Sequence, residues 1–461
     1  MWIFSPLTEV LSLHGLVVAL GLLVFVLASH TLEQRRTPAA AIGWVLAIVF
    51  IPYVAIPLYL LVGTRKLVRF RSYPPFTPPG REITTDDAWP RQLAAAMGQP
   101  PVETYQNLHI HADGTQALQA LWELIDGAKR ELNLCSFIIG RDAMGEALVA
   151  RLISKARAGT RVRVLLDGVG RMMGGSPDLR ALESAGVQTA LFVPLLHSPL
   201  KGRTNLRNHR KLVVADGVRL WCGGRNFAAE YFEGAGDQLP WRDLSFDLSG
   251  PLARQAGELF EGDWAFATGS PRAETKRATQ SEQQPFAQII ASGPDQCDDT
   301  VHALLVTACF KARSRIVAAT AYFLPSDALL MALSLAARRG VIVDLILPGR
   351  SNHRMADLAR HRALRDLAAA GARVWFVPYM LHAKAVVFDD AIAMVGSANL
   401  DTRSLFLNYE LMVAFYAAAD VQRFAGWIEG QREAAERYQA RPPGLLRDLT
   451  EGLVLWLAFQ L

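Results

Sequence analysis

The stretch NHRKLVVADGVRLWCGGRN, residues 208–226, decides the fold, because it recurs as LHAKAVVFDDAIAMVGSAN at residues 381–399. Both copies contain His, one residue, Lys, four residues and Asp, followed after six residues by Gly, then Gly or Ser, one residue and Asn. From the composition, chance predicts about 0.016 copies of the His, Lys and Asp letters in this chain. Two copies with matching ends therefore indicate a duplicated unit.

Each motif places a histidine and a lysine two residues apart. On an extended strand such residues share one face and lie about 6.6 Å apart. His209 with Lys211, and His382 with Lys384, can therefore bracket one phosphate group, to which lysine supplies charge and histidine supplies chemistry. Only 8 of the 48 basic residues are lysines, and two of those 8 fall inside the motifs. A single motif of this kind would be an ordinary solvated strand, but the duplication predicts function.

The rest of each motif is expected to shape the site. Asp216-Gly217 and Asp389-Asp390 are typical of hairpin turns, and each first aspartate lies an odd number of residues from its histidine. We therefore include Asp216 and Asp389 in the catalytic motif but do not expect them to touch substrate. Glycine allows close backbone approach and polar side chains hydrogen-bond phosphoryl oxygens, so the predicted phosphate-binding residues are Gly224, Asn226, Ser397 and Asn399.

A catalytic histidine needs a partner on its second ring nitrogen, which fixes its tautomer and orientation. Asp243 and Glu410 precede the apolar strands LSFDLS and LMVAFY, and they are the candidate orienting carboxylates. A basic run lies before and within the first motif. We expect a solvated loop there, with attraction of an anionic substrate as the second interpretation; its members are Lys201, Arg203, Arg207 and Arg210.

The composition excludes several classes of protein. The chain has 461 residues, 51% of them hydrophobic and 20% charged, which is too apolar for disorder and too polar for a many-span transporter. Its four cysteines are widely separated and form no Cys-x-x-Cys pair, which argues against a disulfide scaffold and a cysteine-based zinc site. No cluster of His, Cys and carboxylate residues has metal-ligand spacing, so no metal is expected.

Two apolar segments precede the motifs. Residues 11–29 and 39–62 contain no formally charged side chain, and each is long enough as a helix, at about 1.5 Å per residue, to cross a ~30 Å hydrocarbon layer. We predict two transmembrane helices, of which Pro52 and Pro57 would kink the second or make it dip and return. A cleaved signal peptide is disfavoured because residues 1–10 contain no Lys or Arg.

Basic residues around these segments set the expected orientation. Arg35 and Arg36 lie between the segments, whereas four basic residues follow the second, at positions 65, 66, 69 and 71. The positive-inside rule therefore favours a cytoplasmic location for the rest of the chain. These four basic residues would also attract anionic lipid headgroups.

The remainder alternates strands and helices and does so twice. The expected strand, helix and strand lie at 131–139, 146–159 and 160–168 in the first copy, and at 314–323, 327–340 and 341–349 in the second. This order predicts a parallel α/β sheet in each copy. We divide the chain into a membrane anchor (1–70), a Pro-rich linker (71–100), a first repeat (101–266), a polar linker (267–285) and a second repeat (286–461).

The C-terminal residues 443–461 can form a short helix with apolar side chains on one side, namely Leu446, Leu449, Leu453, Trp456 and Leu457. Packing against the rest of the chain is the expected role of this helix. A position at the membrane interface is the alternative.

These residues resemble the signature of the phospholipase D superfamily and, within it, the bacterial cardiolipin synthases. The resemblance covers nearly the whole chain, including NHRKLVVADG, GGRNFAAEYF followed by WRDLSFDLSGP, AYFLPSDALL, and LHAKAVVFDD followed by GSANLDTRSLFLNYE. It implies two phospholipase D-like α/β/α repeats that form one pseudo-two-fold catalytic body behind two N-terminal transmembrane helices. The motifs are specific for the superfamily and less specific for the synthases.

The resemblance also implies a reaction. One histidine attacks phosphorus to form a phosphohistidine without a metal or another cofactor, while the other protonates the leaving alcohol and then deprotonates the acceptor. By analogy with the family, His209 is expected to be the nucleophile and His382 the acid and base, although the two motifs are symmetric in sequence. Phosphatidylglycerol would serve as donor and acceptor, giving cardiolipin and glycerol at a bacterial plasma membrane.

Two other functions are consistent with the sequence. A membrane-bound phospholipase D, or a phosphatidyltransferase for another headgroup, would keep the chemistry and change the substrate. A phospholipid-binding scaffold without activity is the non-enzymatic alternative, which two complete motifs disfavour. A nuclease is disfavoured by the apolar segments, and no aromatic and basic strand pattern indicates nucleic-acid binding.

Overall fold

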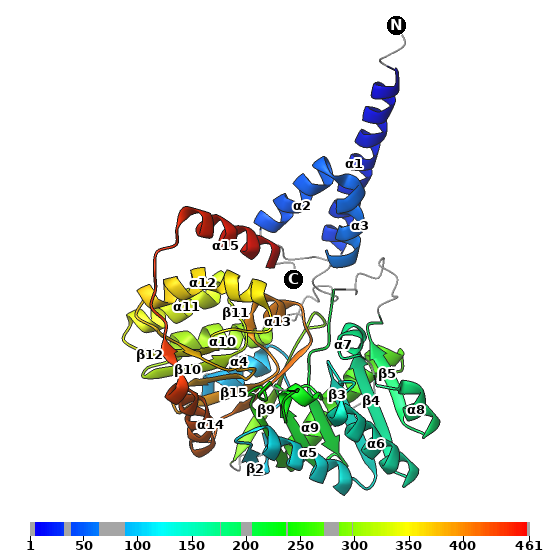
Figure 1. Cartoon of the computed structure of the whole chain (residues 1–461), viewed down its shortest axis with the longest axis vertical. Coiled ribbons are helices and arrows are strands. Elements are labelled where there is room, and N and C mark those ends of the chain that lie inside the picture. The colour runs from blue at the N-terminus through cyan, green and yellow to red at the C-terminus, as the bar shows by residue number, and fades with distance from the viewer. Residues whose placement is uncertain are drawn as a thin grey trace. The chain divides into compact units, whose positions relative to one another are not determined.

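The computed structural model describes residues 5–31, 38–63, 88–175, 177–194, 205–236, 238–271, 285–296 and 298–458. Contacts divide the chain into two compact units (Figure 1). The helical unit contains α1 (Ser5–Thr31), α2 (Pro38–Phe50) and α3 (Pro52–Val62). The other described helices and strands belong to the second unit, which we call the body.

The first repeat forms a seven-stranded sheet in the order β2-β8-β7-β6-β3-β4-β5. β3, β4 and β5 are parallel, and the remaining neighbours pair antiparallel. The strands are β2 (Gln106–Ile110), β3 (Glu131–Ser136), β4 (Arg161–Asp167), β5 (Gln188–Phe192), β6 (Leu212–Ala215), β7 (Arg219–Gly223) and β8 (Ser245–Ser249). The helices are α5 (Gly114–Gly127), α6 (Ala143–Arg157), α7 (Gly168–Met173), α8 (Leu179–Ser184) and α9 (Pro251–Thr268).

The second sheet has nine strands in the order β1-β9-β17-β15-β14-β10-β12-β13-β18; the edge strand β1 comes from the start of the first repeat and the others from the second repeat. Again three strands are parallel, β10, β12 and β13, and the others pair antiparallel. The strands are β1 (Glu103–Thr104), β9 (Phe286–Ser292), β10 (Arg315–Thr320), β12 (Ile342–Pro348), β13 (Arg373–Val377), β14 (Lys384–Phe388), β15 (Ile392–Gly396), β17 (Glu410–Phe415) and β18 (Glu436–Arg437).

The remaining elements of the body lie in the second repeat, except for the helix at residues 89–96, which precedes both repeats. A small parallel pair joins β11 (Phe323–Leu324) to β16 (Leu400–Asp401). The helices are α4 (Trp89–Ala96), α10 (Thr300–Lys311), α11 (Asp327–Arg338), α12 (Arg354–Ala369), α13 (Thr402–Phe406), α14 (Ala418–Gly430) and α15 (Leu445–Ala458). Figure 1 shows α11 and α12 on one side of the second sheet and α14 on the other.

The predicted strand, helix and strand are present in both copies, as β3-α6-β4 and β10-α11-β12. Each helix starts at a capping side chain, since Asp142 accepts from the Gly145 N–H at 2.9 Å and Ser326 from the Leu329 N–H at 3.2 Å. Just beyond the two helices, Gly159 and Gly340 have φ of +90° and +92°. Only glycine adopts this conformation without strain, so the matching glycines show that one local design is used twice.

The strands of the predicted strand-helix-strand units pair in parallel, as expected, but both sheets also contain antiparallel strands. The motif strands run antiparallel to their neighbours, β6 with β7 and β14 with β15. Tight turns at residues 216–218 and 389–391 connect these strands, which confirms the predicted hairpins. A hairpin can join only antiparallel strands, whereas the parallel neighbours are joined through helices.

The two repeats pack through the helices that follow their last motif strands. In α14, Phe424 packs against Phe246 of the first repeat and Phe415 of the second, at centroid distances of 6.1 and 4.8 Å. In α9, Gln255 reaches the second repeat, where its Oε1 accepts from the Ile289 N–H at 3.0 Å. All three phenylalanines are fully buried, and each contributes about 1.5–3 kcal/mol by leaving water. The body is therefore one packed structure.

The helical unit differs from the sequence prediction in its second apolar segment. Residues 39–62 do not form one helix, because the chain breaks at Ile51 and restarts at Pro52 as α3. Proline has no N–H to continue the ladder of α2, whereas Pro57 is accommodated within α3. Among the residues that the structure describes, no helix is both long and apolar enough to cross a membrane.

The C-terminal helix packs on the body, as predicted, but through its polar side. Glu451 of α15 is buried and forms an ion pair of 2.6 Å with Arg365 of α12. By contrast, Leu445, Leu446 and Leu449 are exposed. The apolar side that was expected to mediate packing is therefore turned away from α12 at this end of the helix.

Candidate active site

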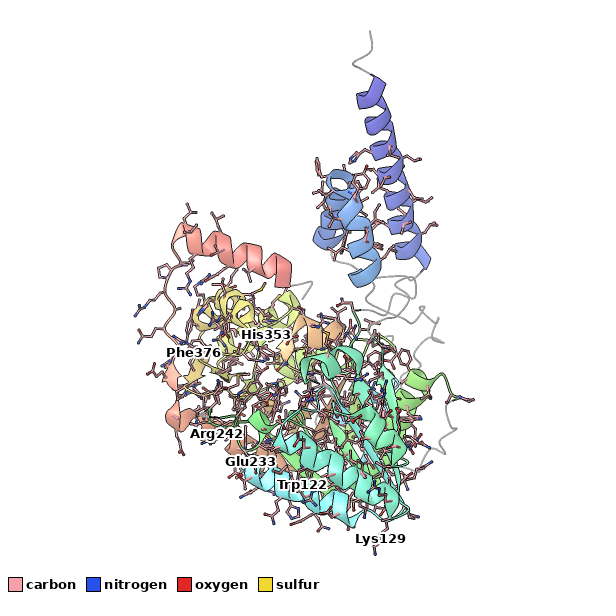
Figure 2. The ribbon with its side chains drawn as sticks, turned by 45° about the vertical axis from the view of Figure 1, so that its right-hand side comes forward. Trp122, Lys129, Glu233, Arg242, His353 and Phe376 are labelled. Carbon is pink, nitrogen blue, oxygen red and sulfur yellow. The ribbon has the colours of Figure 1, made fainter. Side chains whose placement is uncertain are left out.

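Two short backbone bridges between the repeats position the motif histidines. The His209 N–H donates to the Tyr409 carbonyl at 2.9 Å, and the His382 N–H donates to the Arg242 carbonyl at 2.6 Å. Tyr409 directly precedes Glu410, and Arg242, labelled in Figure 2, directly precedes Asp243. Each bridge therefore places a histidine of one repeat beside a carboxylate of the other.

The first half-site joins His209 to Glu410 of the second repeat. His209 Nδ1 lies 3.0 Å from Glu410 Oε1 and 3.1 Å from Oε2. The carboxylate is held in turn by the Ser397 hydroxyl, which donates to Oε2 at 2.5 Å, and by the Asn408 amide, which donates to Oε1 at 3.2 Å. The ring of Phe137 meets the imidazole edge-on at 5.3 Å. With 14% of its side chain exposed, His209 remains reachable from solvent.

The second half-site joins His382 to Asp243 of the first repeat. His382 Nδ1 lies 2.6 Å from Asp243 Oδ2, while Oδ1 accepts from the Leu244 N–H at 2.7 Å. Tyr231 and Trp241 contact the imidazole with centroid distances of 5.1 and 5.6 Å. These two rings, 4.8 Å apart, form what we call the aromatic wall. Only 5% of the His382 side chain is exposed, so this half-site is the drier one.

The motif lysines are buried between these pairs. Lys211 Nζ donates to the His209 carbonyl at 2.6 Å, and Lys384 Nζ donates to the His382 carbonyl and lies 3.1 Å from His382 Nε2. Burial lowers the pKa of Lys211 to about 7, with a further contribution from the charge of Lys384. Burial likewise lowers the pKa of Lys384 to about 8. Both lysines therefore lose their protons more easily than an exposed lysine, and an anion in the site would favour their charged form.

Burial also sets the protonation of the histidine–carboxylate pairs. It lowers the pKa of His209, against the effect of Glu410, and lowers the pKa of His382 to about 3, where Lys384 adds to the effect. Burial alone would raise the pKa of Asp243 and of Glu410, but the neighbouring cations and imidazoles hold both below their ordinary values. Near neutral pH, each pair therefore consists of a neutral imidazole and a carboxylate. The Nδ1–H donates to the carboxylate, so Nε2 carries the lone pair. In His382 this atom lies 3.1 Å from Lys384 Nζ.

The motif aspartates lie at the turns and bind backbone. Asp216 accepts from the N–H groups of residues 129, 130 and 131 at 2.9, 2.6 and 2.9 Å. Asp389 accepts from those of residues 313, 314 and 315 at 2.9, 2.8 and 2.9 Å. Both have positive φ, +55° and +51°, which the short aspartate side chain tolerates. Each aspartate thus ties its motif hairpin to the start of a neighbouring strand, β3 or β10.

The predicted phosphate-binding residues lie close to the histidines, but their side chains already have protein partners. A Cβ on Gly224 would lie 2.3 Å from Asp243 Oδ1, so its missing side chain makes room for the carboxylate. Ser397, at the equivalent position, donates to Glu410. The Asn226 amide donates to the Tyr231 hydroxyl at 2.7 Å, and Asn399 Oδ1 lies 3.4 Å from Thr320 Oγ1. Contact of these residues with phosphate remains a prediction.

The basic run is not a solvated loop where the structure describes it. Arg210 is fully buried, donates to the Glu410 carbonyl at 3.1 Å and to the Ser292 carbonyl at 3.2 Å, and forms an ion pair with Asp263. Arg207 is buried 3.6 Å from Asp167. The prediction of a solvated loop is therefore wrong for these two arginines, because buried carboxylates distant in sequence compensate their charge. Lys201 and Arg203 lie outside the described residues.

The sequence did not predict the aromatic wall or the buried contacts of Arg210 with Asp263 and two carbonyl groups. Trp241 and Tyr231 lie between the first motif and Asp243, and the only signal was that this interval is longer than the one between the second motif and Glu410. Within the described part of the chain, no group of three or more His, Cys, Asp and Glu side chains is arranged to hold a metal ion.

Comparisons with known proteins agree with this architecture. The chain matches the family model described as "Cardiolipin synthase, PLD-like domain" over residues 121–264 and 305–431, and the model described as "Phospholipase_D-nuclease N-terminal" over residues 17–63. The solved structure titled phosphatidylserine synthase from Haemophilus influenzae superimposes with a TM-score of 0.62 at 14% identity, covering 80% of this chain and 97% of its own. At that identity the likeness shows the fold alone.

Curated relatives are more similar in sequence. The protein named Cardiolipin synthase A in Pseudomonas entomophila is 32% identical over 419 residues, which cover 87% of each chain. The protein of the same name in Pseudomonas aeruginosa is 31% identical over 450 residues, covering 93% of this chain and 90% of its own. The chain therefore belongs to the family of phospholipase D-like cardiolipin synthases.

Proposed function

We propose that the protein is a cardiolipin synthase, which transfers the phosphatidyl group of one phosphatidylglycerol to a second and releases glycerol. The observation that carries this proposal is the crossed pairing of His209 with Glu410 and of His382 with Asp243 beside two buried lysines. Two imidazoles, each with Nδ1 beside a carboxylate, suit a reaction that needs a nucleophile on one side of phosphorus and an acid on the other.

In the first step, the His209 Nε2 lone pair attacks the donor phosphorus. A phosphorus–nitrogen bond forms, the bond to the glycerol oxygen breaks, and His382 Nε2–H gives its proton to that oxygen. Glu410 balances the charge that His209 gains. Lys211 and Lys384 offset the phosphate anion, and the anion in turn raises the pKa of His382 so that it can carry the proton. We assign the nucleophile to His209 because it is the more exposed imidazole.

In the second step, the primary hydroxyl of a second phosphatidylglycerol attacks the phosphohistidine. His382 takes the hydroxyl proton, the new phosphorus–oxygen bond forms, and the bond to His209 breaks, which restores both imidazoles. No water is consumed, so the aromatic wall beside His382 has a direct benefit: a dry site disfavours hydrolysis to phosphatidic acid. Gly224, Asn226, Ser397 and Asn399 remain candidates for lining the phosphate position, by direct contact or through the partners described above.

We further propose that residues 1–70 anchor the protein in the bacterial plasma membrane, with the two repeats, 101–266 and 286–461, on the cytoplasmic side. The N-terminal family match supports this location, and so does the proposed substrate, which is a lipid of the bilayer. In the two-crossing arrangement that the sequence predicts, residues 32–37 and the body face opposite sides of the membrane.

The test is a product analysis. The purified full-length protein is incubated with phosphatidylglycerol in detergent, and lipids and glycerol are measured. Equimolar cardiolipin and glycerol are expected. Phosphatidic acid as the only lipid product would indicate a phospholipase D, and transfer only from another donor, such as phosphatidylserine, would indicate a different phosphatidyltransferase. No reaction with any phosphodiester would favour a scaffold.

A further inference from the structure

The residue two positions beyond β10 lies opposite the histidine of the second motif. Thr320, the last residue of β10, pairs with Lys384, the first residue of β14. The two strands run antiparallel, so two residues beyond the one and two before the other bring Tyr322 opposite His382. Tyr322 also lies near the aromatic wall, because burial raises the pKa of Tyr231 and Tyr322 adds to that effect. Tyr322 therefore belongs to the His382 half-site.

Ile138 is the equivalent residue of the first repeat. The antiparallel pairing of β3 with β6 brings it opposite His209 in the same way. A matching hydrogen bond supports the equivalence: the Ser136 hydroxyl donates to the Ile138 carbonyl at 2.7 Å, and the Thr320 hydroxyl donates to the Tyr322 carbonyl at 2.9 Å. The same position thus carries an apolar side chain opposite one histidine and a phenol opposite the other.

The loop after β4 extends the apolar character of the first repeat. There α7 ends with two exposed methionines, Met172 at 61% and Met173 at 59%. The end of α7 packs against Ile138, since a Cβ on Gly174 would lie 2.6 Å from Ile138 Cγ2. The loop beside Ile138 therefore presents apolar side chains.

The equivalent loop after β12 is polar and contacts Tyr322. The Tyr322 hydroxyl donates to Asn352 Oδ1 at 2.5 Å, and its ring meets that of His353 edge-on at 5.4 Å. His353, labelled in Figure 2, directly precedes α12. The loop is held to this helix by the Ser351 N–H, which donates to Asp357 Oδ2 at 2.8 Å. Asn352 and His353 are exposed and can be reached by a ligand. We call Tyr322, Asn352 and His353 the polar cluster.

The polar cluster has the groups that bind hydroxyls. A tyrosine hydroxyl accepts as well as donates, the amide of Asn352 has two N–H donors, and the ring nitrogens of His353 donate or accept according to the tautomer. Burial raises the pKa of Tyr322, so its phenol keeps its proton near neutral pH and can donate. An alcohol with several hydroxyls suits such a set of donors and acceptors, whereas the two motif lysines suit the phosphate.

We propose that the polar cluster binds the glycerol headgroup through its adjacent hydroxyls, and so selects polyols as the alcohols of the reaction. The inference rests on the proposed function, in which His382 exchanges a proton with the alcohol in both steps. In the first step the cluster holds the glycerol that leaves. In the second it holds the secondary hydroxyl next to the primary hydroxyl that attacks. One site serves both alcohols, because the two steps break and form the same kind of phosphorus–oxygen bond.

Competition between two small alcohols tests this selection in the full-length protein. Phosphatidylglycerol is the donor, 1-propanol and 1,2-propanediol are supplied at equal concentration, and the two phosphatidyl alcohols are measured by mass spectrometry. The native protein should prefer the diol by about tenfold, because only the diol has a second hydroxyl for the cluster. Tyr322→Phe keeps the ring and removes the hydroxyl, and we expect it to lower the preference by about fivefold. Asn352→Ala should act in the same direction.

The ratio of the two products separates recognition from folding, since a loss of folded protein lowers both products equally. Met172→Ala, the matched change in the loop of the first repeat, should leave the ratio at its native value. A native ratio near one, a native ratio in both Tyr322→Phe and Asn352→Ala, or an equal fall in Met172→Ala would overturn the headgroup site. Transfer without selection would overturn this site alone. The absence of cardiolipin and of both phosphatidyl alcohols with the native protein would overturn the proposed function, and the headgroup site with it.

Discussion

Each of the two half-sites carries a histidine, a lysine and a carboxylate, but in different surroundings. Glu410 faces His209 with both oxygens and is held by Ser397, whereas Asp243 faces His382 with one oxygen and fits against Gly224. The His209 side is partly open, and the His382 side is closed by the aromatic wall. The difference indicates that a duplicated motif supplies the reactive groups, while the segments outside it give each histidine its own task.

Replacing either histidine should have the largest effect and should reveal this division. We expect His209→Asn and His382→Asn each to lower kcat for cardiolipin formation by at least about 10³-fold, because each removes a group that reacts in both steps. With a p-nitrophenyl ester of phosphatidic acid, whose leaving group needs no proton, His382→Asn should retain a burst of p-nitrophenol and His209→Asn should not. Bursts of equal size would show that the half-sites are interchangeable.

Replacing the orienting carboxylates should have the next largest effect. We expect Glu410→Gln and Asp243→Asn each to lower kcat by about 10²–10⁴-fold, because an amide no longer fixes the imidazole or balances its charge. The crossed pairing can be tested by combining changes, since residues that act together are not additive. In the His209→Asn background, adding Glu410→Gln should lower kcat/KM little further. Adding Asp243→Asn should lower kcat/KM almost as much as it does in the native protein. The reverse pattern in residual kcat/KM would contradict the crossed arrangement.

The aromatic wall should affect pH dependence more than rate. Burial is the main reason that the pKa of His382 is lowered to about 3, so opening the wall with Trp241→Ala should raise that pKa toward its ordinary value. Because His382 acts as the acid when protonated, a higher pKa moves the basic limb of the kcat–pH profile to higher pH. We expect Trp241→Ala to lower kcat itself by about tenfold or less. Phe137→Ala, the matched change beside His209, should leave the basic limb in place. An identical shift in both variants would remove the distinction.

The motif aspartates should affect stability most and chemistry least. Asp216→Asn and Asp389→Asn weaken hydrogen bonds to three backbone N–H groups, and we expect each to cost about 1–3 kcal/mol of unfolding free energy. Backbone hydrogen bonds lower the pKa of both carboxyls against the effect of burial, so this stabilisation is present above their unfolded pKa and is lost as pH falls through the folded pKa. Thermal unfolding at several pH values measures it. A loss of kcat with an unchanged Tm would place these aspartates in the reaction instead.

The sequence predicts local structure well because the signals for it are local. The Asp-Gly and Asp-Asp pairs predict the hairpins, and Pro52 predicts an interruption of the second apolar segment. The expected strand starts later than the motif, because β6 begins at Leu212 and β14 at Lys384, so both histidines precede their strands. Duplication also identifies Asp243 and Glu410 as equivalent. It cannot show that their partners are crossed, because either pairing satisfies a symmetric pattern.

Contacts between residues distant in sequence were not predictable in the same way. Arg210 is buried because Asp263 and two carbonyl groups surround it, and nothing near Arg210 in the sequence shows that. Ser397 follows a glycine, as a phosphate-binding residue would, but the side chain of Glu410 reaches its hydroxyl first. The sheets are mixed because hairpins and crossover helices alternate, which the order of strands and helices leaves open.

The central claim is that two unequal half-sites share one phosphate, with His209 as the nucleophile. Mass spectrometry of the His382→Asn variant after brief reaction with the p-nitrophenyl ester of phosphatidic acid tests it most directly, because the intermediate should accumulate. The account predicts a phosphatidyl adduct on the peptide that contains His209. Phosphatidic acid release with no adduct on His209, or an adduct elsewhere in the chain, would contradict it.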